Sequence, residues 1–554
     1  MRRVTLRWFA NGVALLAAVS LAPAGCDLSP DFPEGVFACS SDDDCPASQR
    51  CVGAGAAARC FTPGVDAGPL PCVPDGLVDL PDASRTDSDC DGVDGTAEAS
   101  VFVSPSGDDL ADGTRATPVR TVQRGMELAV ADSGRDDVLI AAGTYLEAVA
   151  LVEGVHLHGG YELDWTRTAT AITTLRADLP LTADDVSASA RVTGLRFVAN
   201  AATAPGGSSI AARVRGSTGV SLEQVVLEAG AGAPGAPPPT TPARSADAED
   251  GDTGGDGGLV HVDSPPPARG AGGVSACSCV NGGAGGFPSL SAGPRVGLPG
   301  QAVSGAGCVN GATGGPGGSG GMPGADGVRG DGGAAGVEGS FDANGYAPAT
   351  GGSGTSGTAA GGGGGGGGST GFLCDVSNQI NVFGGAGGGG GAGGCGGAGG
   401  AGGAGGGASI GLLLVASQVT LIDVRITAAD GGAGGAGQGG QDGGLGGDGA
   451  GGGLGGNFCS ITPSSNYPAG ATGGNGGTGG SGGGGAGGPG GPSIALLMLE
   501  GATQSGSSSG VQLVVGTGGA GGAGGAAGTG GVGVVGNGAT GPMGTATLMR
   551  TIDP

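Results

Sequence analysis

Apolar residues lie in a few short islands separated by long polar or glycine-rich stretches. The longest island is Val101–Leu175. It opens on a β-prone run at 101–103 and continues with apolar residues at helical spacing within 119–131. Two alternating runs follow at 138–151 and 155–162, with glycines at their turns. This pattern predicts a strand, a helix and then a series of short strands.

Three later runs repeat one pattern. Ser209–Gly230, Ser409–Asp430 and Ser493–Gly516 each begin with Ser-Ile, contain one or two strand-like segments and precede glycine-rich sequence. About 22 residues suits one turn of a structure built from stacked strands. We therefore interpret the glycine-rich stretches as insertions at a corner of that structure. If they leave at the same corner, they project from one side.

Within the first island, many positions match the N-terminal region of one known superfamily. They are Val103, Pro105, Gly107, Asp109, Gly113, Thr114, Pro118, Thr121, Asp137, Val138, Ile140, Gly143, Tyr145 and Glu147. In this order the residues resemble the start of right-handed parallel β-helix proteins of the pectate-lyase-like superfamily. The resemblance implies an all-β fold, a right-handed parallel β-helix with an N-terminal capping helix.

The predicted organisation follows from these patterns and from the cysteines. It comprises a signal peptide (1–25), a Cys-rich segment (26–62), a linker (63–100), the β-helix cap and first coils (101–235), a Gly-rich insertion (236–407), a coil (408–430), a second insertion (431–492) and the last coils with a third Gly-rich insertion (493–554).

Glycine accounts for 140 of the 554 residues. Flexible coil is the default expectation for such tracts, because glycine opposes conformational order. The alternative is a set of packed polyglycine II helices, in which three residues per turn place side chains along one edge. Strict Gly-X-Y repeats with abundant proline are missing, so the tracts are not collagen-like.

The formal net charge is −26, and all 22 basic residues are arginines. So acidic a chain repels nucleic acid and anionic surfaces and attracts divalent cations. We expect no nucleic-acid partner.

The N-terminus has the form of an export signal. Basic residues within 1–7 precede an apolar run at 8–21, which is too short for a stable membrane span. Ala24-Gly25-Cys26 resembles a bacterial lipobox, although Pro23 stands where leucine is usual. The resemblance implies acylation of Cys26, a membrane anchor and a place in the bacterial cell envelope, in an unspecified membrane. Simple cleavage is the alternative.

Twelve further cysteines form two even sets in this exported chain. Two even sets favour disulfides, whose connectivity stays open. The first set is Cys39, Cys45, Cys51, Cys60, Cys72 and Cys90; the second is Cys277, Cys279, Cys308, Cys374, Cys395 and Cys459.

The acidic stretch at 87–98 fits the spacing of a calcium loop. Asp87, Asp89 and Asp91 alternate, Gly92 permits a sharp turn, and Glu98 stands at the closing position. Calcium is therefore the one candidate cofactor. A solvated acidic turn is the alternative, because no amphipathic helix flanks the stretch.

Aromatic and histidine residues suggest few further sites. Tyr161 and Trp165 have the chemistry to stack on sugars, but such residues more often seal a cap or a coil edge. His156 and His158 share one strand face without a third metal ligand, which favours exposed or stacked side chains.

No catalytic site emerges from the sequence. The carboxylates on predicted coils, Asp184, Asp185, Glu223 and Asp423, are scattered. Fold resemblance alone does not confer activity. The favoured function is a non-enzymatic, lipid-anchored surface scaffold, structural or adhesive, that displays the Gly-rich loops. The alternative is a protein that binds or cleaves polysaccharide.

Overall fold

A computed structural model describes residues 37–46, 49–52, 58–62, 79–82, 84–261, 264–277, 280–289, 311–375, 380–456, 468–506 and 510–553. The predicted signal peptide and Cys26 lie outside these residues, as do Cys72, Cys279, Cys308 and Cys459. The chain divides into two compact units. The first comprises Met1–Leu77 with Ser88–Cys90, and the second comprises Val78–Asp87 with Asp91–Pro554.

Disulfides organise the described part of the first unit. A 3-10 turn, η1 (Asp42–Asp44), precedes the antiparallel pair β1 (Arg50–Val52) and β2 (Arg59–Phe61). Cys39 is joined to Cys51, and Cys45 to Cys60. The buried cluster consists of these cysteines and Ala58, so cross-links replace a hydrophobic core. Cys90 is also disulfide-bonded. Disulfides of this kind favour an exported, oxidising location.

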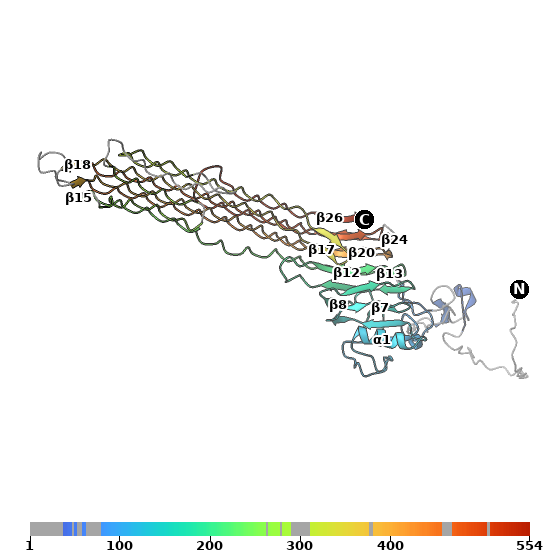
Figure 1. Cartoon of the computed structure of the whole chain (residues 1–554). Coiled ribbons are helices and arrows are strands. Elements are labelled where there is room, and N and C mark those ends of the chain that lie inside the picture. The colour runs from blue at the N-terminus through green and yellow to red at the C-terminus, as the bar shows by residue number, and fades with distance from the viewer. Residues whose placement is uncertain are drawn as a thin grey trace, which may run out of the picture. The chain divides into compact units, whose positions relative to one another are not determined.

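The second unit is nearly all β, with three sheets of parallel strands (Figure 1). The strands of sheet 1 are β3 (Ser100–Val103), β4 (Asp137–Ala141), β7 (His156–Tyr161), β10 (Ala190–Thr193), β13 (Val220–Glu223), β21 (Gln418–Ile422) and β24 (Thr503–Ser505). The strands of sheet 2 are β5 (Gly143–Tyr145), β8 (Thr173–Ala177), β11 (Leu195–Ala199), β14 (Val226–Glu228), β22 (Arg425–Thr427) and β25 (Gln512–Val514). The strands of sheet 3 are β6 (Val149–Ala150), β9 (Leu181–Asp184), β12 (Ser209–Arg215), β20 (Ser409–Val415), β23 (Ser493–Leu499) and β26 (Ala546–Ile552).

From β4 onward the chain visits sheet 1, sheet 2 and sheet 3 in turn, and then begins the next round. Each strand pairs in parallel with the equivalent strand of the following round. The result is a stack of rounds, compatible with a parallel β-helix. One round cannot bury its apolar face alone, whereas stacking produces a continuous core.

A tight turn follows the sheet 3 strand in successive rounds. A residue with left-handed backbone follows sheet 3 strands in four successive rounds, at Asp185, Gly216, Ala416 and Glu500, with φ between 46° and 59°. Since left-handed backbone is costly for residues other than glycine, its recurrence at one corner indicates that the stack imposes this bend.

The core fills the space between the three sheets. Leu175, Phe197, Leu227 and Ile426 occupy equivalent positions in sheet 2, and each is fully buried. They belong to one cluster that extends from Val101 to Ala502. The alternation of apolar and polar residues in the sequence thus separates core from surface, as period-two patterning requires.

One α-helix, α1 (Val122–Ala131), occurs in the described residues. It packs against β3, β4 and β6, at the first rounds of the stack. Its buried side chains, Val122, Met126 and Ala129, join the main core cluster. The Glu147 carboxylate accepts hydrogen bonds from the backbone N–H groups of Val122 and Gln123 at the helix N-terminus, where negative charge is favourable.

The outer face of sheet 3 is also buried in its later rounds. Ile410, Leu413, Ile494 and Leu497 are fully buried there beside Tyr346. Tyr346 comes from a hairpin of β16 (Ser340–Asp342) and β17 (Gly345–Ala347). Burial on both faces explains the uninterrupted apolar character of β20 and β23.

Residues of the predicted linker also pack on the second unit. Val93 is buried with Phe102 and Leu139 on the outer side of sheet 1. The short 3-10 turn η3 (Ala97–Ala99) leads directly into β3. This packing was not predicted from the sequence, because the stretch is rich in Pro, Gly and Asp and contains few apolar residues.

Candidate functional site

All three long insertions leave the stack at the same corner. Residues 229–408, 428–492 and 515–545 each follow a strand of sheet 2 and each lead back into a strand of sheet 3. The earlier rounds cross this corner through the short connections 178–180 and 200–208. The prediction of a common exit corner is therefore confirmed.

Serine hydroxyls line this corner. Ser209, Ser409 and Ser493 occupy equivalent positions in sheet 3 and are at most 1% exposed. Ser409 Oγ donates to Gly230 O at 2.8 Å, and Ser493 Oγ donates to Ala429 O at 2.7 Å. Each accepting carbonyl lies just past the end of a sheet 2 strand. The serines of the Ser-Ile motif thus join the return strands of the first two insertions to the points at which those insertions depart.

Beyond the corner the insertions run side by side as one hydrogen-bonded bundle (Figure 1). Backbone N–H groups of Gly397, Gly400 and Gly403 donate to carbonyls at positions 480, 483 and 486, at 2.8–2.9 Å. The N–H groups of Gly482, Gly485 and Gly488 donate to positions 441, 438 and 435, at 2.8–2.9 Å. The partners recur every third residue, which is the period of polyglycine II. The expectation of flexible coil was wrong for these described residues.

Glycine is required inside the bundle because the chains approach too closely for a side chain. A Cβ added to Gly485 would lie 2.0 Å from Ala401 O, and one added to Gly488 would lie 2.1 Å from Ala404 O. Both distances are far below van der Waals contact. By contrast, a Cβ on Gly451 would meet nothing within 4 Å.

Within the longest insertion, residues larger than glycine follow one edge of the segment 386–404, which we call the central pass. Positions 386, 392, 395, 398, 401 and 404 are all Ala or Cys, and they are separated by multiples of three. Cys395, on this edge, is bonded to Cys277 across 118 residues of sequence. The disulfide therefore links two passes of the longest insertion.

Aspartate side chains of one segment of the bundle, 247–256, accept hydrogen bonds from backbone N–H groups of the neighbouring segment 445–454. Asp247, Asp250 and Asp256 accept hydrogen bonds of 2.7–2.8 Å from the N–H groups of Leu445, Asp448 and Leu454. The acceptors are again separated by multiples of three. These carboxylates thus have a structural role in the bundle.

Far along the insertions, a small sheet has the strand order β15 (Leu259–His261), β19 (Ile380–Val382) and β18 (Phe372–Asp375). The backbone of Cys374 lies in β18, and the structure describes nothing of its side chain.

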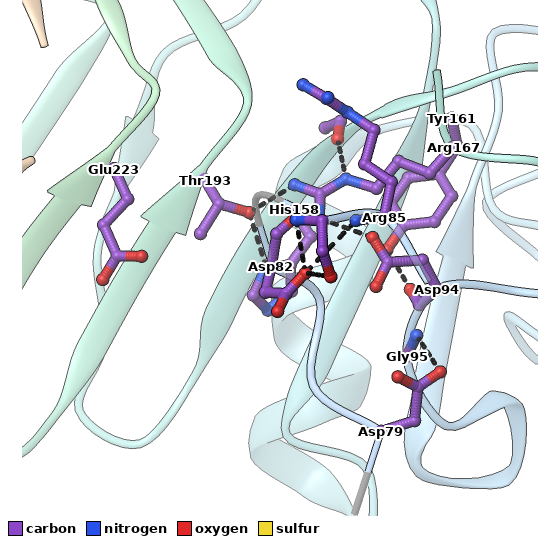
Figure 2. A network of polar contacts seen from close by, with 12 residues as sticks. Asp79, Asp82, Arg85, Asp94, Gly95, His158, Tyr161, Arg167, Thr193 and Glu223 are labelled. Atoms are coloured by element: carbon purple, nitrogen blue, oxygen red, sulfur yellow. Dashed lines mark hydrogen bonds and ion pairs between the residues drawn. The ribbon is translucent and has the colours of Figure 1, made fainter. Parts of the chain in front are cut away.

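A second candidate site is a buried polar network on the outer side of sheet 1 (Figure 2). His158 Nε2 lies 2.9 Å from Asp137 Oδ1, and His158 Nδ1 lies 2.8 Å from Thr193 Oγ1. Arg167 Nη2 donates to the same Thr193 hydroxyl, and Arg167 Nη1 forms a 2.8 Å ion pair with Asp94 Oδ2. Tyr161 donates to the Asp94 carbonyl.

Burial controls the ionisation of this network. Burial lowers the pKa of His158, so the ring is neutral near pH 7, with both nitrogens engaged. Burial opposes ionisation of Asp137, yet its hydrogen bond with His158 holds the pKa of this carboxyl below the usual range. Burial raises the pKa of Asp94 despite the Arg167 guanidinium, and Asp94 Oδ1 has no hydrogen-bond partner among the described residues.

The structure places the predicted aromatic and histidine candidates inside this packing. Tyr161 and Trp165 are buried in a cluster with Phe102, whose ring centroid lies 4.7 Å from that of Trp165. They seal the outside of sheet 1, as the sequence favoured. His158 is not exposed: it is 1% exposed and hydrogen-bonded through both ring nitrogens. Its ring lies edge-on to that of His156, with centroids 6.4 Å apart, so the expected ring contact is present.

Two of the predicted calcium ligands form backbone hydrogen bonds in the second unit. Asp87 accepts from the N–H groups of Asp91 and Gly92, and Asp91 accepts from those of Val93 and Ala97. Glu98 is exposed on η3. Asp89 lies in Ser88–Cys90, which belongs to the first unit.

The strand carboxylates considered for catalysis are largely engaged. Asp184 pairs with Arg213 and Arg215, each at 3.3 Å, and Glu223 pairs with Arg191 at 2.6 Å. The buried ion pair between Arg167 and Asp94 was not predicted from the sequence. The one available signal was the charged Asp94, which stands where a calcium loop has an apolar residue.

Comparison with known protein families, curated proteins and solved structures finds no match for this chain. In the described residues, helices long and apolar enough to span a bilayer are missing.

Proposed function

We propose that this protein is a non-enzymatic scaffold of the bacterial cell surface, anchored by lipid at Cys26, that displays a bundle of polyglycine II segments. In this proposal the strand stack is a right-handed parallel β-helix of the pectate-lyase-like type. Helix α1 caps its first round. The bundle is the structural or adhesive element.

The observation that carries the proposal is the common origin of the bundle. Three insertions, widely separated in sequence, leave one corner and are hydrogen-bonded to one another at three-residue intervals. A linker needs no such order. Hydrogen bonds hold both the base and the interior of the insertions in place. This order supports a role in which the exposed surface of the bundle performs the function.

The alternative is binding or cleavage of polysaccharide, which the resemblance to lyases suggests. Ion pairs at Asp184 and Glu223 disfavour catalysis by these groups, because a general acid or base needs access to the substrate. We therefore place the scaffold role first.

The test is incubation of the purified full-length protein with acidic polysaccharides, with and without calcium. The scaffold proposal predicts unchanged polymer length. Depolymerisation would overturn it, and binding without cleavage would favour a polysaccharide-binding protein.

The anchor and the location are tested in cells. Labelling with a palmitate analogue should mark the wild-type protein but not Cys26→Ala. External protease should release fragments of the bundle from intact cells. Equal labelling of the two proteins would refute the lipid anchor.

Calcium binding at Asp87, Asp89, Asp91 and Glu98 is part of the proposal. Alternate carboxylates beside Gly92 favour Ca²⁺ coordination. Calorimetric titration with calcium should give saturable heat, which Asp89→Asn abolishes. Arg85→Gln, a change at a nearby basic residue, is the matched control and should retain the heat. If both variants retain the heat of calcium binding, calcium binds at another site.

A further inference from the structure

A cavity of about 360 Å³ opens beside the outer face of sheet 2. Four arginines contribute to its wall: Arg85, Arg167, Arg196 and Arg425. Glu228 is the one acidic residue in the lining. This balance is unusual in a chain with 48 acidic and 22 basic residues.

The register of sheet 2 directs two of these arginines outward. Arg196, Val226 and Arg425 are aligned on β11, β14 and β22. Their neighbours Phe197, Leu227 and Ile426 are fully buried on the core side. Because side chains alternate along a strand, Arg196 and Arg425 share the outer face, with backbones separated by about 10 Å, or two strand spacings.

The charges at the cavity are unequally neutralised. Arg196 pairs with Glu228 at 2.6 Å, and Arg167 pairs with Asp94 within the buried network. Arg425 and Arg85 make no side-chain hydrogen bond or ion pair with any described residue. Arg85 and Arg167, both labelled in Figure 2, line the same cavity. Two guanidinium groups at one cavity are therefore left without an acidic partner.

The remaining wall is neutral. Ile172 is 59% exposed, Val226 is half-buried, and Thr168 and Gln224 add neutral polar groups. The volume falls within the range of small-molecule sites. Guanidinium forks bind carboxylate and phosphate-like oxyanions through paired hydrogen bonds.

We propose that this cavity is a binding site for a small organic oxyanion, held by Arg85 and Arg425, with its apolar part against Ile172. The site is independent of the glycine bundle, so it does not depend on the scaffold function. The shared chemistry is a compact group of negatively charged oxygens, supplied by a carboxylate, a phosphate or a sulfate.

The test is calorimetric titration of the full-length protein at low ionic strength with three probes: glutarate, inorganic phosphate and inorganic sulfate. At least one probe should bind at a single site, and the probe that binds identifies the oxyanion class. The double variant Arg85→Gln/Arg425→Gln should bind roughly tenfold more weakly or worse, because it loses both charge-assisted contacts.

Arg176→Gln is the matched control. Arg176 is exposed on β8 of the same sheet and does not line the cavity. It should bind like the wild type. Since Arg425 is exposed, the single variant Arg425→Gln provides a folded comparison, checked by circular dichroism. The proposal is overturned if no probe binds, if the double variant binds normally, or if Arg176→Gln loses binding equally.

Discussion

The hydroxyl of Ser409 donates a hydrogen bond of 2.8 Å to the carbonyl of Gly230, 179 residues earlier in the chain. Gly230 lies where the longest insertion leaves the strand stack, and Ser409 begins the strand to which that insertion returns. The contact closes the base of the insertion. A motif visible in the sequence therefore joins the start of the longest insertion to its return.

Replacing Ser409 by alanine should lower the free energy of unfolding by about 1–2 kcal/mol, because the partly buried Gly230 carbonyl loses its hydrogen-bond donor. Chemical denaturation measures the effect. Ser505→Ala is the control, since the Ser505 hydroxyl is exposed and is bonded to Thr420. Equal stability of the two variants would show that the corner hydrogen bond contributes nothing.

Gly485→Ala should destabilise the bundle by about 1–3 kcal/mol, because the new methyl group would collide with the Ala401 carbonyl. Gly451→Ala should be neutral, since the space around Gly451 is open. Thermal melting compares the variants. A bundle that tolerates both substitutions equally is not close-packed at Gly485.

Peptide mapping under non-reducing conditions should recover three linked pairs: Cys39–Cys51, Cys45–Cys60 and Cys277–Cys395. Cys395→Ser should speed proteolysis within the longest insertion and leave the first unit unchanged, because the lost link lies within the bundle. Cys39→Ser should give the reverse pattern. A partner other than Cys277 for Cys395 would contradict the packing of the two passes that this disulfide joins.

Stability should fall as the pH drops from 7.5 toward 5. Because the pKa of His158 is lowered in the folded state, the unfolded chain takes up the proton first as the pH falls through the ordinary histidine value of about 6.5. Asp137, Thr193, Arg167 and His156 surround the ring. The Asp137 carboxylate favours the protonated ring, but burial together with the Arg167 guanidinium outweighs it, so the pKa of His158 stays lowered.

His158→Gln should flatten this pH dependence, even if it lowers stability at every pH. Urea denaturation at pH 5.5 and 7.5 measures the slope, with His156→Gln as the control. An unchanged slope in His158→Gln would show that the buried ring does not titrate as described.

The sequence predicted those features that repeat within it. The Ser-Ile starts at Ser209, Ser409 and Ser493 lie in register, and the alternating runs around Leu222 and Ile426 form strands of the core. These positions are predictable because each round presents the same local pattern to its neighbours.

Features that depend on distant partners were not predictable. Asp94 meets Arg167 across 73 residues. The charge of Asp94 is unusual for its position in a calcium-loop pattern, but nothing local identifies Arg167 as its partner. The hairpin that carries Tyr346 covers sheet 3 from inside a glycine-rich insertion, where composition suggested coil. Order in the bundle was also obscured, because it comes from backbone groups of passes far apart in the sequence.

The central claim is that the insertions form a packed, hydrogen-bonded bundle. Hydrogen–deuterium exchange of the full-length protein tests it most directly, with peptides covering 383–407 and 470–491 compared with strands β20 and β23. The bundle predicts amides at Gly400, Gly403, Gly485 and Gly488 that exchange slowly, on the timescale of the strands. Complete exchange of both peptides within seconds, while β20 and β23 remain protected, would contradict the account.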